Sequence, residues 1–165
     1  MSEIVRRYFL RKKEAKLLLD EASRTLRIDA DNMFGSKPQV EVIETPRHKV
    51  FLVNALPLLA KSEEDLFPTL FFEEFLSRLP KVIVDMGAVQ HICSGADVMA
   101  PGIAEIQGDF KEKSLAVVLD AKNRKPIAIV RSLLDSETAK NLKKGKVFKN
   151  LVYIGDDIWN LGRTP

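Results

Sequence analysis

The sequence predicts an α+β protein of two domains, an α/β domain over residues 1–80 and a mainly β domain over residues 81–165. Two patterns support this division. An apolar stripe at helical spacing stands near the start of the chain, whereas short β-like runs dominate from Lys81 onward. A content of 45% hydrophobic and 30% charged residues is typical of a globular chain that can build a core.

The first predicted element is a helix whose apolar residues recur at spacings of three and four and so share one face. These residues are Ala15, Leu18, Leu19, Ala22 and Leu26. A polar segment over 29–37 interrupts this pattern, with Gly35 and Pro38 as breaks. Strands are predicted over 40–42 and 50–53, with a turn at 45–47 between them. Residues 56–60 match no single pattern.

A second helix is predicted behind Pro68, because proline suits the first turn of a helix. Its apolar face ends at Pro80 and consists of Phe71, Phe72, Phe75, Leu76 and Leu79. Large apolar side chains at this spacing are most simply core residues, which seal the N-terminal domain or join it to the next one.

The second half of the chain shows strands that alternate with turns. Strands are predicted over 82–84, 115–119, 127–130 and 152–154, with a turn over 120–124. A short helix is predicted over 136–142, capped by Asp135 or Ser136 and ending before Gly145. Strands at this spacing with only short helices favour a small barrel.

Small residues and a Pro-Gly corner mark the segments 84–89 and 94–103. Glycine permits positive φ and lets another chain or a ligand approach the backbone closely. Pro101 fixes its own φ and moves Ala100 away from helical geometry, so the chain is expected to turn there. The pattern indicates backbone brought close to a ligand or another strand, with a pair of structural turns as the alternative.

Two motifs in the second half resemble those of a known family. The order Asp85-x-Gly87-Ala88, then Ser94-Gly95-Ala96-Asp97-x-Met99-x-Pro101-Gly102, resembles the opening of a PUA domain, a small RNA-binding β-barrel of pseudouridine synthases and archaeosine transglycosylases. Residues 143–159 resemble its closing segment, with a Gly, an Asn, an aromatic residue, an Asp and a late Trp. The resemblance covers residues 82–159 and implies a C-terminal PUA pseudo-barrel.

Phe67-Pro68-Thr69-Leu70 resembles the junction found in one branch of these proteins. That branch comprises translation-reinitiation and ribosome-recycling proteins that pair an N-terminal α/β pre-PUA domain with a PUA domain. It includes the malignant-T-cell-amplified-sequence family and short archaeal versions of similar length. This chain departs from the family pattern in having Val152 for a His, expected to alter a ligand contact, and Ala100 for a Cys.

The resemblance implies that RNA lies against the first helix, the strand after the Pro-Gly corner and the closing strand of the PUA domain. The RNA-binding residues expected on this basis, together with nearby lysines, are Gly95, Ala96, Asp97, Val98, Pro101, Gly102, Ile103, Lys143, Lys144, Lys146, Asn150 and Tyr153. Backbone N–H and C=O groups at the glycines would meet phosphates and base edges, while lysines neutralise phosphate charge. Such a surface suits a duplex end or a tRNA-like terminus.

The net charge of +3 and the pI near 9.0 permit nucleic-acid binding without requiring it. One basic cluster comprises Arg6, Arg7, Arg11, Lys12, Lys13 and Lys16, and a second comprises Lys140, Lys143, Lys144, Lys146 and Lys149. The second cluster is adjacent to the expected RNA surface, whereas the first either binds ribosomal RNA or only increases solubility. Tyr153 either stacks on a base or packs, and Trp159 is expected to anchor the barrel.

No catalytic residue, metal site or cofactor is predicted. His91 and Ser94 lack an orienting acid, and the adjacent Asp156 and Asp157 lack further ligands. A single cysteine, Cys93, excludes an internal disulfide and makes a Cys/His zinc site improbable. No apolar run approaches the roughly 20 residues of a membrane span, and residues 1–16 lack a signal-peptide pattern. We therefore expect a cytoplasmic monomer.

The sequence thus predicts a non-catalytic RNA-binding protein that acts in translation and docks on small-subunit rRNA, the tRNA acceptor end, or both. Its expected partners are RNA, the small ribosomal subunit and a translation factor. The alternative is an RNA-recognition subunit of a tRNA or rRNA modification enzyme of the transglycosylase or pseudouridine synthase type. A third hypothesis is a protein-interaction adaptor that uses the same fold.

Overall fold

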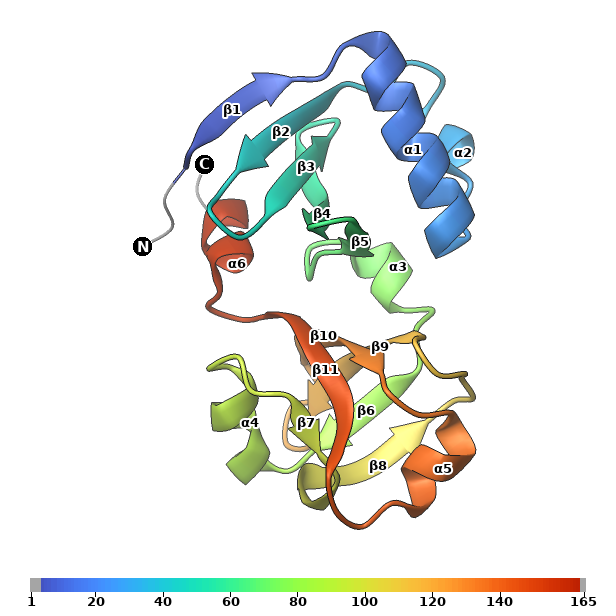
Figure 1. The fold of residues 1–165 in the computed structure, drawn as a ribbon, viewed down its shortest axis with the longest axis vertical. Coiled ribbons are helices and arrows are strands. Elements are labelled where there is room, and N and C mark those ends of the chain that lie inside the picture. Colours follow the sequence, from blue (N-terminus) through green and yellow to red (C-terminus); the bar gives the residue numbers. More distant parts are fainter. Residues whose placement is uncertain (1–3, 164–165) are drawn as a thin grey trace. The chain divides into compact units, whose positions relative to one another are not determined.

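The computed structural model describes residues 4–163, which divide into two compact units. The N-terminal unit contains residues 4–72 and 160–163, and the C-terminal unit contains residues 73–159. Figure 1 labels the elements of each unit. Helices and strands both contribute to the chain, so the predicted α+β class is confirmed.

The N-terminal unit is built on a five-stranded antiparallel sheet whose strands follow one another in chain order. The strands are β1 (Arg6–Phe9), β2 (Val40–Glu44), β3 (Lys49–Val53), β4 (Leu56–Ser62) and β5 (Asp65–Pro68). Two helices, α1 (Lys12–Leu26) and α2 (Ala30–Phe34), connect β1 to β2. The five residues of the predicted apolar stripe are all buried in α1, which confirms that helix.

Three elements of this unit differ from the prediction. The basic N-terminal segment contains an edge strand, β1, and the polar segment after α1 contains α2, which begins with the Asp29 side chain accepting a hydrogen bond from the Asn32 N–H, 3.1 Å. The prediction that Pro68 begins a helix was wrong, because Pro68 ends β5. Since β5 lies at the edge of the sheet, a proline is tolerated there.

The helix predicted between Pro68 and Pro80 is also shorter than predicted, because only Glu73–Leu76 (α3) is helical. The burial predicted for this segment is confirmed for Phe72, Phe75 and Leu76, whereas Phe71 and Leu79 are half-buried. In the N-terminal unit, the Phe72 ring lies 6.1 Å from the Phe34 ring, centroid to centroid. The spacing of the phenylalanines therefore predicted the burial of apolar surface but not the length of the helix.

The C-terminal unit contains a six-stranded sheet in the order β7-β11-β10-β9-β6-β8, in which only β6 and β9 are parallel. Its strands are β6 (Lys81–Val84), β7 (Val98–Met99), β8 (Ile103–Gln107), β9 (Leu115–Asp120), β10 (Pro126–Ser132) and β11 (Lys146–Tyr153). The predicted strands at 82–84, 115–119 and 127–130 are confirmed. The closing strand, β11, begins six residues earlier than predicted.

Beside α3, three further helices and a 3-10 turn complete the C-terminal unit. They are α4 (Met86–Ile92), η1 (Ala100–Gly102), α5 (Ser136–Asn141) and the first part of α6 (Asp157–Gly162). Asp135 caps α5 through a hydrogen bond from the Thr138 N–H, 2.8 Å, as predicted. Side chains from α4, α5 and all six strands meet in one core around Val82, Val118, Val130 and Phe148, with those of β8 only partly buried. This core fixes the position of β7 and β11, which carry Val98, Lys146, Asn150 and Tyr153 of the candidate site.

Candidate RNA-binding site

The loop after α4 is closed by its own backbone. Asp85 caps the start of α4 by accepting a hydrogen bond from the Ala88 N–H, 2.8 Å. At the other end, the N–H of Gly95 donates to the carbonyl of Ile92 and the N–H of Ala96 donates to that of His91, both 3.0 Å. Both N–H groups therefore have acceptors within the protein, and their contact with phosphates stays a prediction. They satisfy carbonyls at the end of the helix, as backbone groups of helix ends must.

Gly95 is required by the geometry of this loop. Its φ is +97°, in the left-handed region where glycine alone is unstrained. A Cβ at this position would lie 3.3 Å from the hydroxyl oxygen of Tyr153. The Tyr153 ring thus packs beneath the loop and against the core, which favours the packing role over the stacking role.

Asn150 fastens the same loop to β11. Its side-chain amide donates to the carbonyls of Ile92, 3.1 Å, and Ala96, 3.0 Å, and its backbone N–H donates to the Asp97 carboxylate, 2.8 Å. The Asn150 Oδ1 atom is buried and has no hydrogen-bond partner within residues 4–163. Because its amide hydrogens are already committed, Asn150 is placed to hold the loop in position rather than to contact RNA directly.

Asp97 forms an ion pair with Lys146, with Oδ2 and Nζ 2.8 Å apart. Burial raises the pKa of the Asp97 carboxyl. The hydrogen bonds from Lys146 and from the Asn150 N–H, with the charges of Lys146 and Lys149, lower this pKa and together outweigh the effect of burial. The net effect is a pKa below the ordinary value, so this carboxylate is charged near neutral pH. Lys146 is therefore neutralised within the protein, and a phosphate must compete with Asp97 for it.

The Pro-Gly corner brings a second stretch of backbone against α4. Gly102 accepts a hydrogen bond from the Asp85 N–H, 3.0 Å, and a Cβ at Gly102 would lie 2.9 Å from the Cβ of Ala88. A side chain does not fit there without displacing the helix. The predicted turn at Pro101 is confirmed as η1, and Pro101 itself is exposed.

The structure brings these predicted residues together by pairing β7 with β11. Figure 1 shows β11 between β7 and β10, with α4 beside β7. Gly95, Ala96, Pro101, Lys143 and Lys144 are exposed, whereas Gly102 and Ile103 are half-buried. The side chain of Val98 is 1% exposed and lies in the core, so only its neighbours face solvent.

Val152, which departs from the family pattern, is also only 1% exposed. This residue pairs with Ile129 of β10, and its side chain is buried. The Val152 side chain therefore packs in the interior, and an effect of the change from His to Val on a ligand contact stays a prediction.

Two exposed methionines near the site were not predicted. Met99 lies opposite Lys146 across the β7–β11 pair, and Met86 begins α4. Both side chains are about half exposed. Methionine is flexible and polarisable, which makes it suited to irregular apolar or aromatic contacts. The sequence around Met99 has no periodic pattern that would predict exposure of this side chain, and only the β7–β11 pairing places Met99 at the site.

Acids neutralise part of each basic cluster. Within residues 4–163 the cations without an ion pair are Arg11, Lys12 and Lys13 in the first cluster and Lys143, Lys144 and Lys149 in the second. In the N-terminal cluster, Arg7 forms a two-pronged pair with Glu41, 2.7 and 3.1 Å, and Arg6 lies 3.6 Å from Glu44. In the C-terminal cluster, Lys143 and Lys144 form no ion pair or side-chain hydrogen bond within residues 4–163. Counterions on such unpaired lysines are available for release when phosphate binds.

The candidate catalytic and metal-binding side chains are engaged in structural contacts. The Ser94 hydroxyl donates to the carbonyl of Gln90, 2.9 Å, rather than to His91. Asp156 accepts hydrogen bonds from the N–H groups of Tyr153, 3.0 Å, and Trp159, 2.7 Å. Among residues 4–163, no three acidic, histidine or cysteine side chains gather as metal ligands would. Over the same residues, no helix has the length and apolarity to cross a bilayer.

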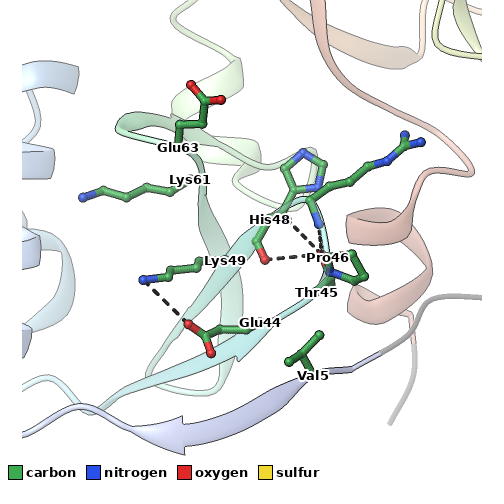
Figure 2. Close-up of a pocket in the computed structure, with 9 residues that line it drawn as sticks. Val5, Glu44, Thr45, Pro46, His48, Lys49, Lys61 and Glu63 are labelled. Carbon is green, nitrogen blue, oxygen red and sulfur yellow. Dashed lines mark hydrogen bonds and ion pairs between the residues drawn. The ribbon is translucent and has the colours of Figure 1, made fainter.

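The N-terminal unit has a cavity of about 500 Å³ at the β2–β3 turn (Figure 2). Thr45 shapes this turn, because its hydroxyl accepts hydrogen bonds from the N–H groups of Arg47, 3.3 Å, and His48, 3.0 Å. The cations and acids of the lining largely offset each other, and Lys49 lies 3.6 Å from Glu44. The full lining is Val5, Glu44, Thr45, Pro46, Arg47, His48, Lys49, Lys61 and Glu63. This balance makes the cavity a weaker candidate for phosphate than the C-terminal site.

Comparison with known proteins assigns both halves of the chain. Residues 80–154 match the PUA domain family, and residues 6–73 match a domain of unknown function, DUF1947. A crystal structure of a hypothetical protein from Pyrococcus horikoshii is 31% identical, with a TM-score of 0.75, over 95% of this chain and 99% of that one.

Three curated proteins extend the comparison. The uncharacterized protein MJ1432 of Methanocaldococcus jannaschii is 37% identical over 96% of this chain and 98% of its own length. Translation machinery-associated protein 20 of Saccharomyces cerevisiae is 29% identical over 79% of this chain and 76% of its own length. A probable tRNA pseudouridine synthase B of Pyrobaculum calidifontis is 39% identical over 75 residues, which are 46% of this chain and 22% of that enzyme. The chain therefore belongs to the family that joins a DUF1947 domain to a C-terminal PUA domain, whose members include the translation machinery-associated proteins.

Proposed function

We propose that this protein is a non-catalytic, cytoplasmic RNA-binding protein that acts in translation. Its C-terminal domain docks on small-subunit rRNA, on the acceptor end of tRNA, or on both. The observation that carries the proposal is the gathering of the exposed loop residues 94–96, the Pro-Gly corner and the unpaired Lys143 and Lys144 on one domain. Similarity to the translation machinery-associated proteins over most of the chain supports the choice of translation.

The binding mechanism we propose combines shape and charge. Gly95 and Gly102 permit backbone turns that side chains would obstruct, so the surface offers a defined shape to an RNA end. Asn150 and Asp97 hold that shape from beneath through hydrogen bonds to the loop and to β11. Lys143 and Lys144 supply affinity that depends on salt, because binding phosphate releases counterions.

A second candidate is an RNA-recognition subunit of a tRNA or rRNA modification enzyme. The specific observation in its favour is that the match to the tRNA pseudouridine synthase spans only 46% of this chain, a share similar to that of the PUA match. On this alternative, the same surface presents RNA to a catalytic partner. Recovery of a modification enzyme with the protein, rather than ribosomal subunits, would favour it.

The experiment that tests the proposal is sequencing of the RNA crosslinked to the tagged protein in its own cells. A Lys143→Glu/Lys144→Glu variant is compared with a Lys111→Glu/Lys113→Glu variant, which carries the same charge change outside the predicted site. Lys146 is left unchanged, because its substitution would leave the charge of the Asp97 carboxylate without its partner. We expect small-subunit rRNA or tRNA ends to be enriched with the wild type and the control and lost with the site variant. Absence of any enriched RNA would refute the proposal.

A further inference from the structure

The turn between β9 and β10 carries a run of cations outside the predicted RNA-binding residues. Residues 121–126 read Ala-Lys-Asn-Arg-Lys-Pro, contain no acid and are all exposed. The side chains of Lys122, Arg124 and Lys125 form no ion pair or hydrogen bond within residues 4–163. Three cations within four residues, without compensating charge, create a local positive potential.

The backbone of this turn is held rigidly. The Asp120 carboxylate accepts a hydrogen bond from the Asn123 N–H, and the Asp120 carbonyl accepts one from the Arg124 N–H, 3.0 Å. The Asp120 N–H donates to the carbonyl of Lys125, 3.3 Å. Asp120 is itself buried, so its carboxylate turns inward to the backbone while the cations project outward. Cations on a fixed backbone lose less conformational freedom on binding than cations on a mobile loop.

The turn lies beside the Pro-Gly corner of the candidate RNA-binding site. In the sheet, Asp120 of β9 pairs with Val84 of β6, and Val84 pairs with Ile103 of β8. Since neighbouring strands are 4.7–4.9 Å apart, Asp120 and Ile103 are separated by about 10 Å. The Ala121 N–H also donates to the Val84 carbonyl, 2.9 Å, which fixes the start of the turn at this row.

We propose that the β9–β10 turn is an additional RNA contact, in which Lys122, Arg124 and Lys125 bind the phosphate backbone of RNA docked at the Pro-Gly corner. The inference rests on the proposed function. The two acids near the turn, Asp85 and Asp120, both accept hydrogen bonds from backbone N–H groups and form no ion pair with the three cations within residues 4–163. An acidic protein would also satisfy these charges, but closeness to the corner favours one ligand that contacts both.

The test is the salt dependence of RNA affinity in the full-length protein. The probes are an in vitro transcribed tRNA and a hairpin that carries an acceptor stem with its single-stranded end. A Lys122→Gln/Lys125→Gln variant is compared with Lys111→Gln/Lys113→Gln, which removes the same charge near the far end of β9. Six residues of strand place these two sites about 20 Å apart. A Lys143→Gln/Lys144→Gln variant reports on the proposed function itself.

The slope of log affinity against log salt is negative, and each lost phosphate contact reduces its magnitude by about 0.7–0.9. For Lys122→Gln/Lys125→Gln we expect a decrease of about 1.4–1.8, so the loss of affinity from 50 to 200 mM salt shrinks by about 7–12-fold. The Lys111→Gln/Lys113→Gln control should keep the wild-type slope. Equal slopes for the turn variant and the wild type would overturn this inference, and loss of a co-purifying protein in that case would point to an acidic protein partner. If the wild type shows no salt-dependent RNA binding, the proposed function itself fails.

Discussion

An Asn150→Asp substitution replaces the amide that fastens the loop after α4 to β11 with a carboxylate of the same shape. The wild-type amide donates to the carbonyls of Ile92 and Ala96, at 3.1 and 3.0 Å. A carboxylate donates nothing and repels both carbonyl oxygens. It also comes close to the Asp97 carboxylate, which accepts the backbone N–H of the same residue. The substitution therefore tests the loop attachment without creating a cavity.

Two lost hydrogen bonds at about 1 kcal/mol each give an expected destabilisation of about 2 kcal/mol, which an Asn150→Ala variant should show. Confining a carboxylate among acceptors adds about 1–2 kcal/mol, so Asn150→Asp should lose about 3–4 kcal/mol at neutral pH. The folded state disfavours the charged form of this new carboxyl and so raises its pKa. The extra loss should hence disappear as the pH falls through that raised pKa.

The assay is urea unfolding of both variants followed by the fluorescence of Trp159, the single tryptophan of the chain. Because Trp159 belongs to the C-terminal unit, it reports on the domain that carries the loop. Unfolding is measured at neutral pH and again at mildly acidic pH. A change below about 0.5 kcal/mol for Asn150→Asp would refute the argument, since surface substitutions commonly have effects of this size. An equal loss at both pH values would refute the electrostatic part alone.

Three further predictions concern the same domain. Gly95→Ala forces a side chain into φ +97° and against Tyr153, and we expect a loss of about 1–2 kcal/mol or more in urea unfolding. The lowered pKa of Asp97 means that its ion pair stabilises the fold above the ordinary pKa and is lost as pH falls through the lower, folded-state pKa. The stability gap between wild type and Asp97→Asn should therefore be full near neutral pH and shrink below about pH 4, as acid titration of Trp159 fluorescence would show. Burial raises the pKa of Cys93, so a thiol reagent at pH 8 should modify the native protein more slowly than the urea-unfolded chain.

The elements that the sequence predicted correctly are those whose pattern is local. The stripe of α1 and the apolar runs of β6, β9 and β10 each report burial through spacing within one segment. The Asp135 cap and the turn at 120–124 are likewise determined by neighbouring residues. Short-range chemistry therefore predicted much of the framework that positions the candidate site.

The missed elements depend on residues far away in the sequence. The strand β1 has only four residues, and its arginines find their partners on β2, such as Glu41, which is 34 residues from Arg7. The strand β7 has two residues and exists because β11 pairs with it. Period-two alternation cannot be recognised in so few residues, so such strands become visible only when the sheet is assembled.

The same long-range effect determines which cations of the candidate site are available. Lys143, Lys144 and Lys146 look alike in the sequence, but of the three only Lys146 forms an ion pair with Asp97. These two residues are 49 positions apart in the sequence, and the β7–β11 pairing brings them together. Conversely, Lys122 and Lys125 look like ordinary turn residues in the sequence, and only sheet pairing places the start of their turn, Asp120, in the same row as Ile103. An exposed ion pair contributes little to stability, so breaking one to bind a phosphate costs little. In the unbound protein, however, the acid of the pair cancels the positive charge that would attract the phosphate. The cations that determine RNA affinity at the candidate site should accordingly be the unpaired ones, Lys143 and Lys144 with the β9–β10 turn, rather than Lys146, which Asp97 pairs.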